Sequence, residues 1–200
     1  MARRALVAAT SNPGKLEEFR TLLADLPLRV VSLEGLDPVR FPEEGSDYAA
    51  NALAKAQAVA DQLGQWAVAD DSGLEVSALG GAPGPLSARF GGAGLDDAGR
   101  VAHLLRTLEE QGAQDWSGRF VCVASLVRPG LDPLMVHGEC PGRIVTPARG
   151  RAGFGYDPIF MPEGFDATMA ELPPGEKDRI SHRGRAFARL REALSIEMSV

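Results

Sequence analysis

The 200-residue chain has few residues of several kinds, and each shortage excludes a class of protein. Its two cysteines, Cys122 and Cys140, are too few for a disulfide framework and lack metal-binding spacing. No segment approaches the roughly 20 apolar residues of a membrane span, and the apolar run after Arg3-Arg4 is too short for a signal peptide. We therefore expect a cytoplasmic protein with no membrane partner and with both thiols in its core.

An excess of basic charge is also missing. The 21 Lys and Arg residues are outnumbered by 27 Asp and Glu, which gives a net charge of −6 and a pI near 5.1. No global positive field therefore attracts nucleic acid, and we expect no nucleic-acid partner. The chain does have 44% hydrophobic and 24% charged residues, which is typical of globular proteins. Its length suits one domain over residues 1–200, which can have two lobes.

A strand, a polar turn and a helix start follow one another near the N-terminus. Residues 5–10 predict a buried strand, and Ser11-Asn12-Pro13-Gly14-Lys15 follows. Ser or Asn can cap the next helix, and Pro is favoured at its first position. Free backbone N–H groups at a helix start attract phosphate, and Lys15 adds a positive charge. The same residues also fit an ordinary capped helix with a solvated lysine.

The segment ADDSGL, residues 69–74, holds two adjacent carboxylates, Asp70 and Asp71. They follow the apolar run 66–69, and a second strand is expected over residues 74–79. Carboxylates at a strand end lie where α/β proteins bind ligands. Because neighbouring strand side chains point to opposite faces, only one of the two can face a given cleft. The alternative interpretation is a solvated acidic turn.

The rest of the chain predicts an alternation of helices and strands. Strands are expected at residues 29–33 and 120–127, with one or two more over 133–145. Helices are expected at 46–63, capped by Ser46, and at 96–111 and 176–194. Loops are expected at 34–44, at the Gly- and Pro-rich segment 80–94, and at 153–158.

Local sequence leaves the chemistry of these segments open. Glu43 and Glu44 precede a helix, where acids are commonly dipole partners or solvated. Phe154 and Tyr156 either stack on a flat ligand or anchor a turn. The basic cluster at residues 177–183 is commonly a solvated helix face.

Six segments, in order along nearly the whole chain, resemble the inosine/xanthosine triphosphate pyrophosphatase family. They are TSNPGK (10–15), EEGSDYAANALAKA (43–56), ADDSGLEV (69–76), LGGAPGPLSARF (79–90), GFGYDPIF (153–160) and EKDRISHRG (176–184). One is weak evidence, but six in order are highly specific. The chain departs from the family at Asp47-Tyr48 and Ala50, where Thr-Phe and Glu are more usual.

The resemblance implies an α/β fold with two lobes around a long, bent, mixed β-sheet flanked by helices, with the active cleft between the lobes. It implies a homodimer. It also implies Mg²⁺-dependent hydrolysis of ITP, dITP and XTP to the nucleoside monophosphate and pyrophosphate, which removes these nucleotides from the nucleotide pool.

Carried over by position, the resemblance also assigns residue roles. Asp71 would accept the proton of the attacking water, and Glu43 and Asp71 would hold the metal. The substrate would be bound by Thr10, Ser11, Asn12, Pro13, Gly14 and Lys15 at its phosphates, by Ser72, and by Phe154, Gly155, Tyr156, Asp157, Lys177, His182 and Arg183 around its purine.

The chemistry of the reaction suits these residue types. Cleavage between the α and β phosphorus atoms needs positioning and charge neutralisation more than covalent catalysis. Mg²⁺ prefers oxygen ligands and keeps waters, so one or two carboxylates suffice. Two alternatives stay open: a pyrophosphatase that acts on modified pyrimidine or methylated nucleotides, and a non-catalytic nucleotide-binding module.

Overall fold

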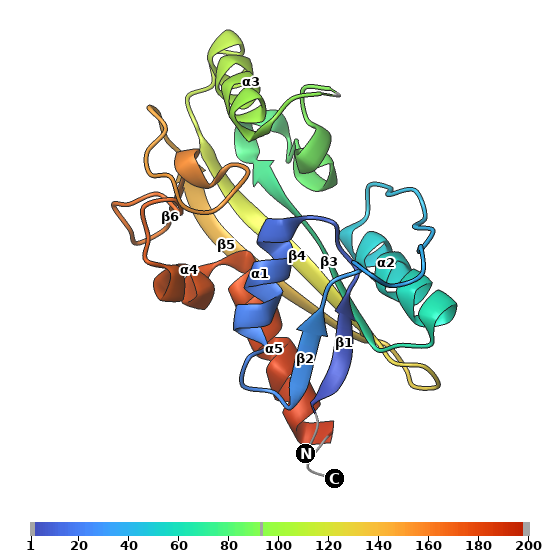
Figure 1. Cartoon of the computed structure of the whole chain (residues 1–200). Helices are drawn as coiled ribbons and strands as arrows, with labels where there is room; N and C mark the ends of the chain where they lie inside the picture. The colour runs from blue at the N-terminus through green and yellow to red at the C-terminus, as the bar shows by residue number, and fades with distance from the viewer. Residues whose placement is uncertain (1–2, 93, 198–200) are drawn as a thin grey trace. The chain divides into compact units, whose positions relative to one another are not determined.

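The computed structural model describes residues 3–92 and 94–197; strands and helices alternate up to α3 (Asp97–Glu110), and three strands and then two helices follow (Figure 1). The strands are β1 Arg4–Ala8, β2 Leu28–Val31, β3 Ala67–Val76, β4 Ser117–Val127, β5 Leu134–Ile144 and β6 Phe160–Pro162. The α-helices are α1 Pro13–Leu22, α2 Tyr48–Leu63, α3 Asp97–Glu110, α4 Pro174–Ile180 and α5 His182–Glu197. No helix in this part of the chain is long and apolar enough to cross a membrane.

The strands form one sheet in the order β2-β1-β3-β4-β5-β6. Strand β1 pairs in parallel with β2 and β3, so that Val7 lies opposite Val31 on one side and Ala67 on the other. Strands β5 and β6 pair antiparallel, so the sheet is mixed. The structure therefore confirms the predicted α/β class with a mixed sheet flanked by helices.

The chain forms two compact units. Unit 1 comprises Met1–Asp71, Cys122–Gly138 and Arg183–Val200, and unit 2 comprises Ser72–Val121 and Glu139–His182. Among the predicted site residues, those in unit 1 are Thr10 to Lys15, Glu43, Asp71 and Arg183. Those in unit 2 are Ser72, Phe154 to Asp157, Lys177 and His182. The two groups are described below within their own units.

The core of unit 1 has helices on both faces of its strands. Leu6 and Ala8 of β1 belong to the cluster that contains residues of α1 and α5, and Val7 and Ala9 belong to the cluster that contains residues of α2. This division follows from the alternation of side chains along a strand.

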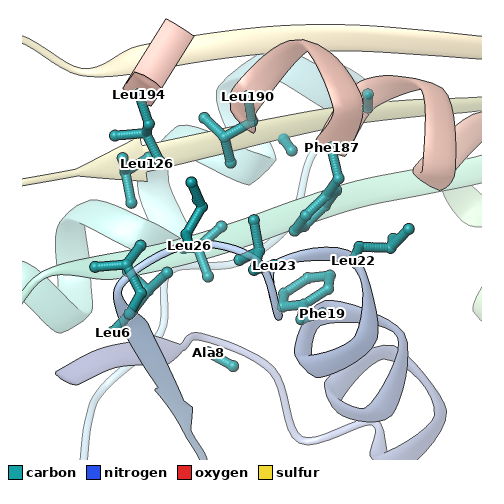
Figure 2. Packing of buried hydrophobic residues seen from close by; sticks show 14 of the residues in the cluster. Leu6, Ala8, Phe19, Leu22, Leu23, Leu26, Leu126, Phe187, Leu190 and Leu194 are labelled. Atoms are coloured by element: carbon teal, nitrogen blue, oxygen red, sulfur yellow. The ribbon is translucent and has the colours of Figure 1, made fainter. Parts of the chain in front are cut away.

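Helices α1 and α5 pack against each other through aromatic rings. The rings of Phe19 and Phe187 lie 4.6 Å apart between centroids, and Figure 2 shows Leu23 and Leu190 in the same cluster. Fully burying side chains of this size stabilises a fold by about 1.5–3 kcal/mol each. The packing of Phe19 therefore anchors α1, whose first turn carries Lys15.

Unit 2 has a core of its own. Leu74 and Val76 of β3, Phe120 of β4 and Ile144 of β5 form a buried cluster with α3, to which the helix contributes Leu104 and Leu108. Tyr156 and Ile159 belong to the same cluster. This core holds the segment around residues 153–159 against the strands of unit 2.

The expected strand end at Asp70 and Asp71 is wrong, and so is the alternative interpretation as a turn, because β3 runs without interruption from Ala67 to Val76. The predicted strand over residues 74–79 stops at Val76 and continues as a 3-10 turn, Ser77–Leu79. Gly73 allows a close approach of two segments instead of a turn, because a Cβ there would lie only 2.0 Å from the carbonyl oxygen of Gly84.

Three other boundaries differ from the predictions. Asp47, not Ser46, caps α2 by accepting a hydrogen bond from Ala50 N. The predicted terminal helix is two helices, since Ser181 has extended backbone angles between α4 and α5. The loop over 80–94 includes the 3-10 helix Gly84–Arg89, with residue 93 outside the described residues. Residues 133–145 contain one strand, β5, which agrees with the expected one or two strands.

Candidate functional site

The segment before α1 is a capped helix start. Asn12 Oδ1 accepts hydrogen bonds from Gly14 N at 2.8 Å and Lys15 N at 3.2 Å, and Pro13 occupies the first turn. Asn12 N in turn donates to Thr10 Oγ1, while Ser11 is exposed. The expected capped turn is confirmed, but its amides at positions 12, 14 and 15 are already bonded. The positive group that this turn offers a phosphate is therefore chiefly the Lys15 ammonium.

Asp70 is a buried ionic partner of two cations. Its Oδ1 lies 2.9 Å from Lys15 Nζ, and its Oδ2 accepts from Arg183 Nε at 3.0 Å and Nη2 at 2.7 Å. Arg183 also donates to Glu18. Burial opposes ionisation of Asp70, but Arg183 and Lys15 outweigh it and hold the pKa of this carboxyl far below its ordinary range. Asp70 is therefore ionised throughout the physiological range.

Asp71 faces a different set of side chains. Its Oδ2 accepts from Asn51 Nδ2 at 2.7 Å, and its Oδ1 lies 3.7 Å from Lys55 Nζ. Both partners come from α2, whereas the two cations that contact Asp70 come from α1 and α5. The two acids thus point to opposite faces of β3, as expected for neighbours in a strand. Both are buried, so the interpretation as a solvated turn is wrong.

The pKa of Asp71 moves in the opposite direction to that of Asp70. Burial raises the pKa of Asp71 above its ordinary value, although Lys55 and the hydrogen bond from Asn51 partly oppose this. A carboxylate with a raised pKa is a better proton acceptor than an ordinary aspartate. Of the two acids, Asp71 therefore has the electrostatic environment of a general base, and Asp70 has that of a fixed counter-ion.

Lys55 links Asp71 to a second carboxylate. Its Nζ donates to Glu44 Oε1 at 2.8 Å, and interactions with Asp70, Glu44 and Asp71 raise its pKa despite burial. Sequence reasoning missed Asn51, Lys55 and this role of Glu44. The sequence contains a pattern that predicts that Asn51 and Lys55 lie side by side. Residues four apart on a helix share a face, and NALAKA places these two at that spacing.

Two carboxylates, those of Glu44 and Asp71, lie on either side of the Lys55 ammonium. Their oxygens are the ligand type that Mg²⁺ prefers, although Lys55 and the Asn51 amide contact Asp71 here. Residues 3–92 and 94–197 contain no group of three or more His, Cys, Asp or Glu that could hold a metal by itself. Mg²⁺ needs only one or two carboxylates when water and phosphate oxygens complete its shell. Glu43, the predicted second ligand, is exposed in the preceding loop.

In unit 2, three of the predicted purine-binding residues come together. Asp157 Oδ2 accepts from Lys177 Nζ at 2.8 Å and from Phe154 N at 3.0 Å. The Lys177 ammonium lies 5.3 Å from the centroid of the Phe154 ring. Gly153 has φ +76°, and a Cβ there would lie 1.9 Å from Asp157 Oδ2, so this turn requires glycine. A flat ring and an oriented cation are thus adjacent.

The other predicted residues of this group have structural contacts. Tyr156 is in the core and donates to the carbonyl oxygen of Ser87 at 3.0 Å, so its ring anchors the turn. Gly155 N donates to Asp97 Oδ2 at 2.7 Å. The His182 ring is buried and stacked on Phe120, with 4.7 Å between centroids. Ser72 is half-buried in β3.

One groove of about 780 Å³ lies in unit 2 on the ends of β3, β4, β5 and β6. None of the predicted site residues lines it. Arg119, which lines the groove, is ion-paired with both Glu75 and Glu139, and such exposed pairs contribute little to stability. The candidate site is therefore the two groups around Asp71 and Lys177.

Known proteins share both the sequence and the fold of this chain. The Ham1 family model matches residues 6–193. The dITP/XTP pyrophosphatase of Desulfotalea psychrophila is 46% identical over 187 residues, which cover 93% of this chain and 83% of the relative. The dITP/XTP pyrophosphatase of Mycobacterium bovis is 47% identical over 193 residues and covers 94% of each chain.

A solved structure agrees with these matches. The structure of a Ham1 protein from Coxiella burnetii is similar with a TM-score of 0.86 and 41% identity, and the match covers 96% of this chain and 98% of that one. The chain belongs to the Ham1 family. The sequence resemblance to the inosine/xanthosine triphosphate pyrophosphatases is thereby confirmed.

Proposed function

We propose that this chain hydrolyses non-canonical purine nucleoside triphosphates, with ITP, dITP and XTP as substrates. The products are the nucleoside monophosphate and pyrophosphate. Relatives that match nearly all of this chain are named dITP/XTP pyrophosphatases. The observation that carries the proposal is the pair Asp70–Asp71. One acid is a fixed counter-ion beside Lys15, and the other is a buried carboxylate of raised pKa beside Lys55.

In this mechanism Asp71 accepts a proton from the water that attacks the α-phosphorus. The hydrogen bond from Asn51 holds the carboxylate in one orientation, and burial keeps its pKa raised. The Lys15 ammonium binds the phosphates that leave as pyrophosphate. Lys55 adds a second positive charge close to Asp71. These are the positioning and charge-neutralising functions that phosphoryl chemistry requires.

Asp71 and Glu43 would hold Mg²⁺, as the family resemblance implies, and Glu44 is a further carboxylate beside Lys55. The bound ion supplies charge neutralisation at the phosphates and lowers the pKa of water. Removal of divalent cations by a chelator should abolish turnover, and activity that persists in excess chelator would exclude the metal.

We assign recognition of the base to the group in unit 2. Phe154 offers a ring face, and Asp157 orients the Lys177 ammonium beside it. An ammonium group donates hydrogen bonds and cannot accept them. It therefore suits the 6-oxygen of hypoxanthine and xanthine and opposes the 6-amino group of adenine.

Pyrophosphate release from a panel of nucleotides tests the proposal. ITP, dITP and XTP should be cleaved far faster than ATP, whose 6-amino group opposes Lys177. GTP also carries a 6-oxygen, so its slower cleavage has to come from exclusion of its 2-amino group and not from Lys177. Faster cleavage of modified pyrimidine or methylated nucleotides would favour the alternative pyrophosphatase. Tight binding without any turnover would favour a nucleotide-binding module.

We also propose a cytoplasmic homodimer on the family resemblance, and light scattering that gives the monomer mass at micromolar concentration would contradict the dimer.

A further inference from the structure

We propose that Asp70 is a positioning residue that holds the Lys15 ammonium where the phosphates of the substrate bind. The proposal rests on the function proposed above and assigns a role to the acid that the mechanism does not use. It separates the two adjacent acids of ADDSGL into one that handles a proton and one that orients a cation.

Geometry gives each oxygen of Asp70 its own cation. Oδ1 lies 2.9 Å from Lys15 Nζ, and Oδ2 accepts both hydrogen bonds from Arg183. The Asp70 side chain is 0% exposed and the Lys15 side chain only 16%. A lysine on a flexible four-carbon stem is therefore fixed by a single buried contact. The contact is an ion pair, and the ammonium group carries three donor hydrogens with which it can bind a ligand.

The two cations do not depend on Asp70 equally. Arg183 has a second carboxylate, because it also donates to Glu18. Among the described residues, Asp70 is the one acid within ion-pair distance of Lys15. The loss of Asp70 therefore leaves Arg183 with a partner and Lys15 without one.

The substitution Asp70→Asn tests this difference between Lys15 and Arg183. Its single side-chain oxygen would turn toward Arg183, which offers two donors, so its NH₂ group would face Lys15. A donor against an ammonium group repels it. Asp70→Asn should therefore release Lys15 while it leaves Arg183 bound by the Asn oxygen and Glu18.

The test is a double-mutant cycle with Lys15→Met and Asp70→Asn, read out by the Kd for inorganic tripolyphosphate and by kcat/KM for ITP. Tripolyphosphate has no base, so its binding reports on the phosphate contacts and stands whether or not ITP is the substrate. Hydrogen bonds to charged groups predict a loss of about 10- to 100-fold for Lys15→Met. Asp70→Asn should lose affinity by a comparable or smaller factor, and the double variant should lie within about threefold of Lys15→Met.

Glu18→Gln is the matched control. It removes a carboxylate from the same buried cluster but not from Lys15, so its tripolyphosphate affinity should stay within about twofold of wild type even if its Tm falls. If Asp70→Asn gives no folded protein, Asp70→Glu is used in its place. The Asp70→Glu variant keeps a negative charge beside Arg183 but moves the oxygen that holds Lys15.

Losses that multiply in the double variant would overturn the proposal, as would wild-type tripolyphosphate affinity in a folded Asp70 variant. An equal loss in Glu18→Gln would show that the cluster acts only through general stability. If wild type binds tripolyphosphate but cleaves none of the 6-oxopurine triphosphates, the proposed function fails while the positioning role can still be measured.

Discussion

Asp71→Asn should remove catalysis while it leaves the fold as stable as wild type. The variant keeps the size of the side chain and an oxygen that can accept from Asn51. Loss of a general base typically lowers the rate by about 10²–10⁴-fold. Because burial raises the pKa of Asp71 in the chain without metal, wild type should bind a proton at Asp71 above the ordinary Asp value of 3.8, and added Mg²⁺ should lower this pKa. Asp71→Asn should lack this proton uptake.

The stability effect follows from the direction of the pKa shift. A raised folded-state pKa means that the fold disfavours the ionised Asp71 at neutral pH. A neutral Asn relieves this penalty, and Lys55 keeps Glu44 as its partner. We expect a free energy of unfolding within about 1 kcal/mol of wild type or above it, which is a Tm no more than about 2–4 °C lower.

Asp70→Asn should behave in the opposite way. The folded-state pKa of Asp70 is far below its ordinary value, so its ionised form stabilises the fold above pH 4, and this contribution is lost as the pH falls through the folded pKa. Breaking a buried ion pair costs about 3–5 kcal/mol, or roughly 6–20 °C in Tm for a chain of this size. Thermal unfolding at pH 7 of the two variants compares them directly. Equal losses of Tm, or a larger loss for Asp71→Asn, would refute the assignment of opposite environments.

Three further predictions concern other residues. Lys15→Ala should weaken ITP and XTP by similar factors in steady-state kinetics, because both share the triphosphate, and a large loss for one base alone would contradict its role. Lys177→Met should lower kcat/KM for ITP far more than for ATP and so shrink their ratio; if both fall together, Lys177 binds phosphate instead. Burial raises the pKa of Tyr156 to about 12. The fold therefore favours the neutral phenol, and stability should fall as the pH rises from about 10 to about 12. In a Tm series against pH, Tyr156→Phe should flatten this limb, and an unchanged slope would show that Tyr156 is not its source.

Much of the fold could be predicted from sequence periodicity. Apolar spacing and capping residues predict the strand at residues 5–10, the capped helix after Asn12 and the helix ending at Leu63. The continuity of β3 could not be predicted from the sequence, since Asp-Asp-Ser-Gly has the composition of a turn. Tertiary contacts stabilise the strand there, because Lys15 of α1 and Arg183 of α5 neutralise the charge of Asp70.

The candidate site shows the same limit. Family resemblance named Asp71 and Lys15, but it gave no partner for either. The contact of Asp70 with Arg183 joins positions 113 residues apart, and no local pattern reports such a pairing. Asn51 and Lys55 lie four residues apart on one face of α2, so helical spacing could predict that they are neighbours, but the alanine-rich sequence around them has the pattern of a core-facing helix and not of a site.

The most direct test of the account is the identity of the products from ITP. We expect ³¹P NMR of the reaction with Mg²⁺ to show inosine monophosphate and pyrophosphate in equal amounts, with no early orthophosphate, and with ATP cleaved far more slowly. Release of orthophosphate with inosine diphosphate, or equal rates for ITP and ATP, would contradict it.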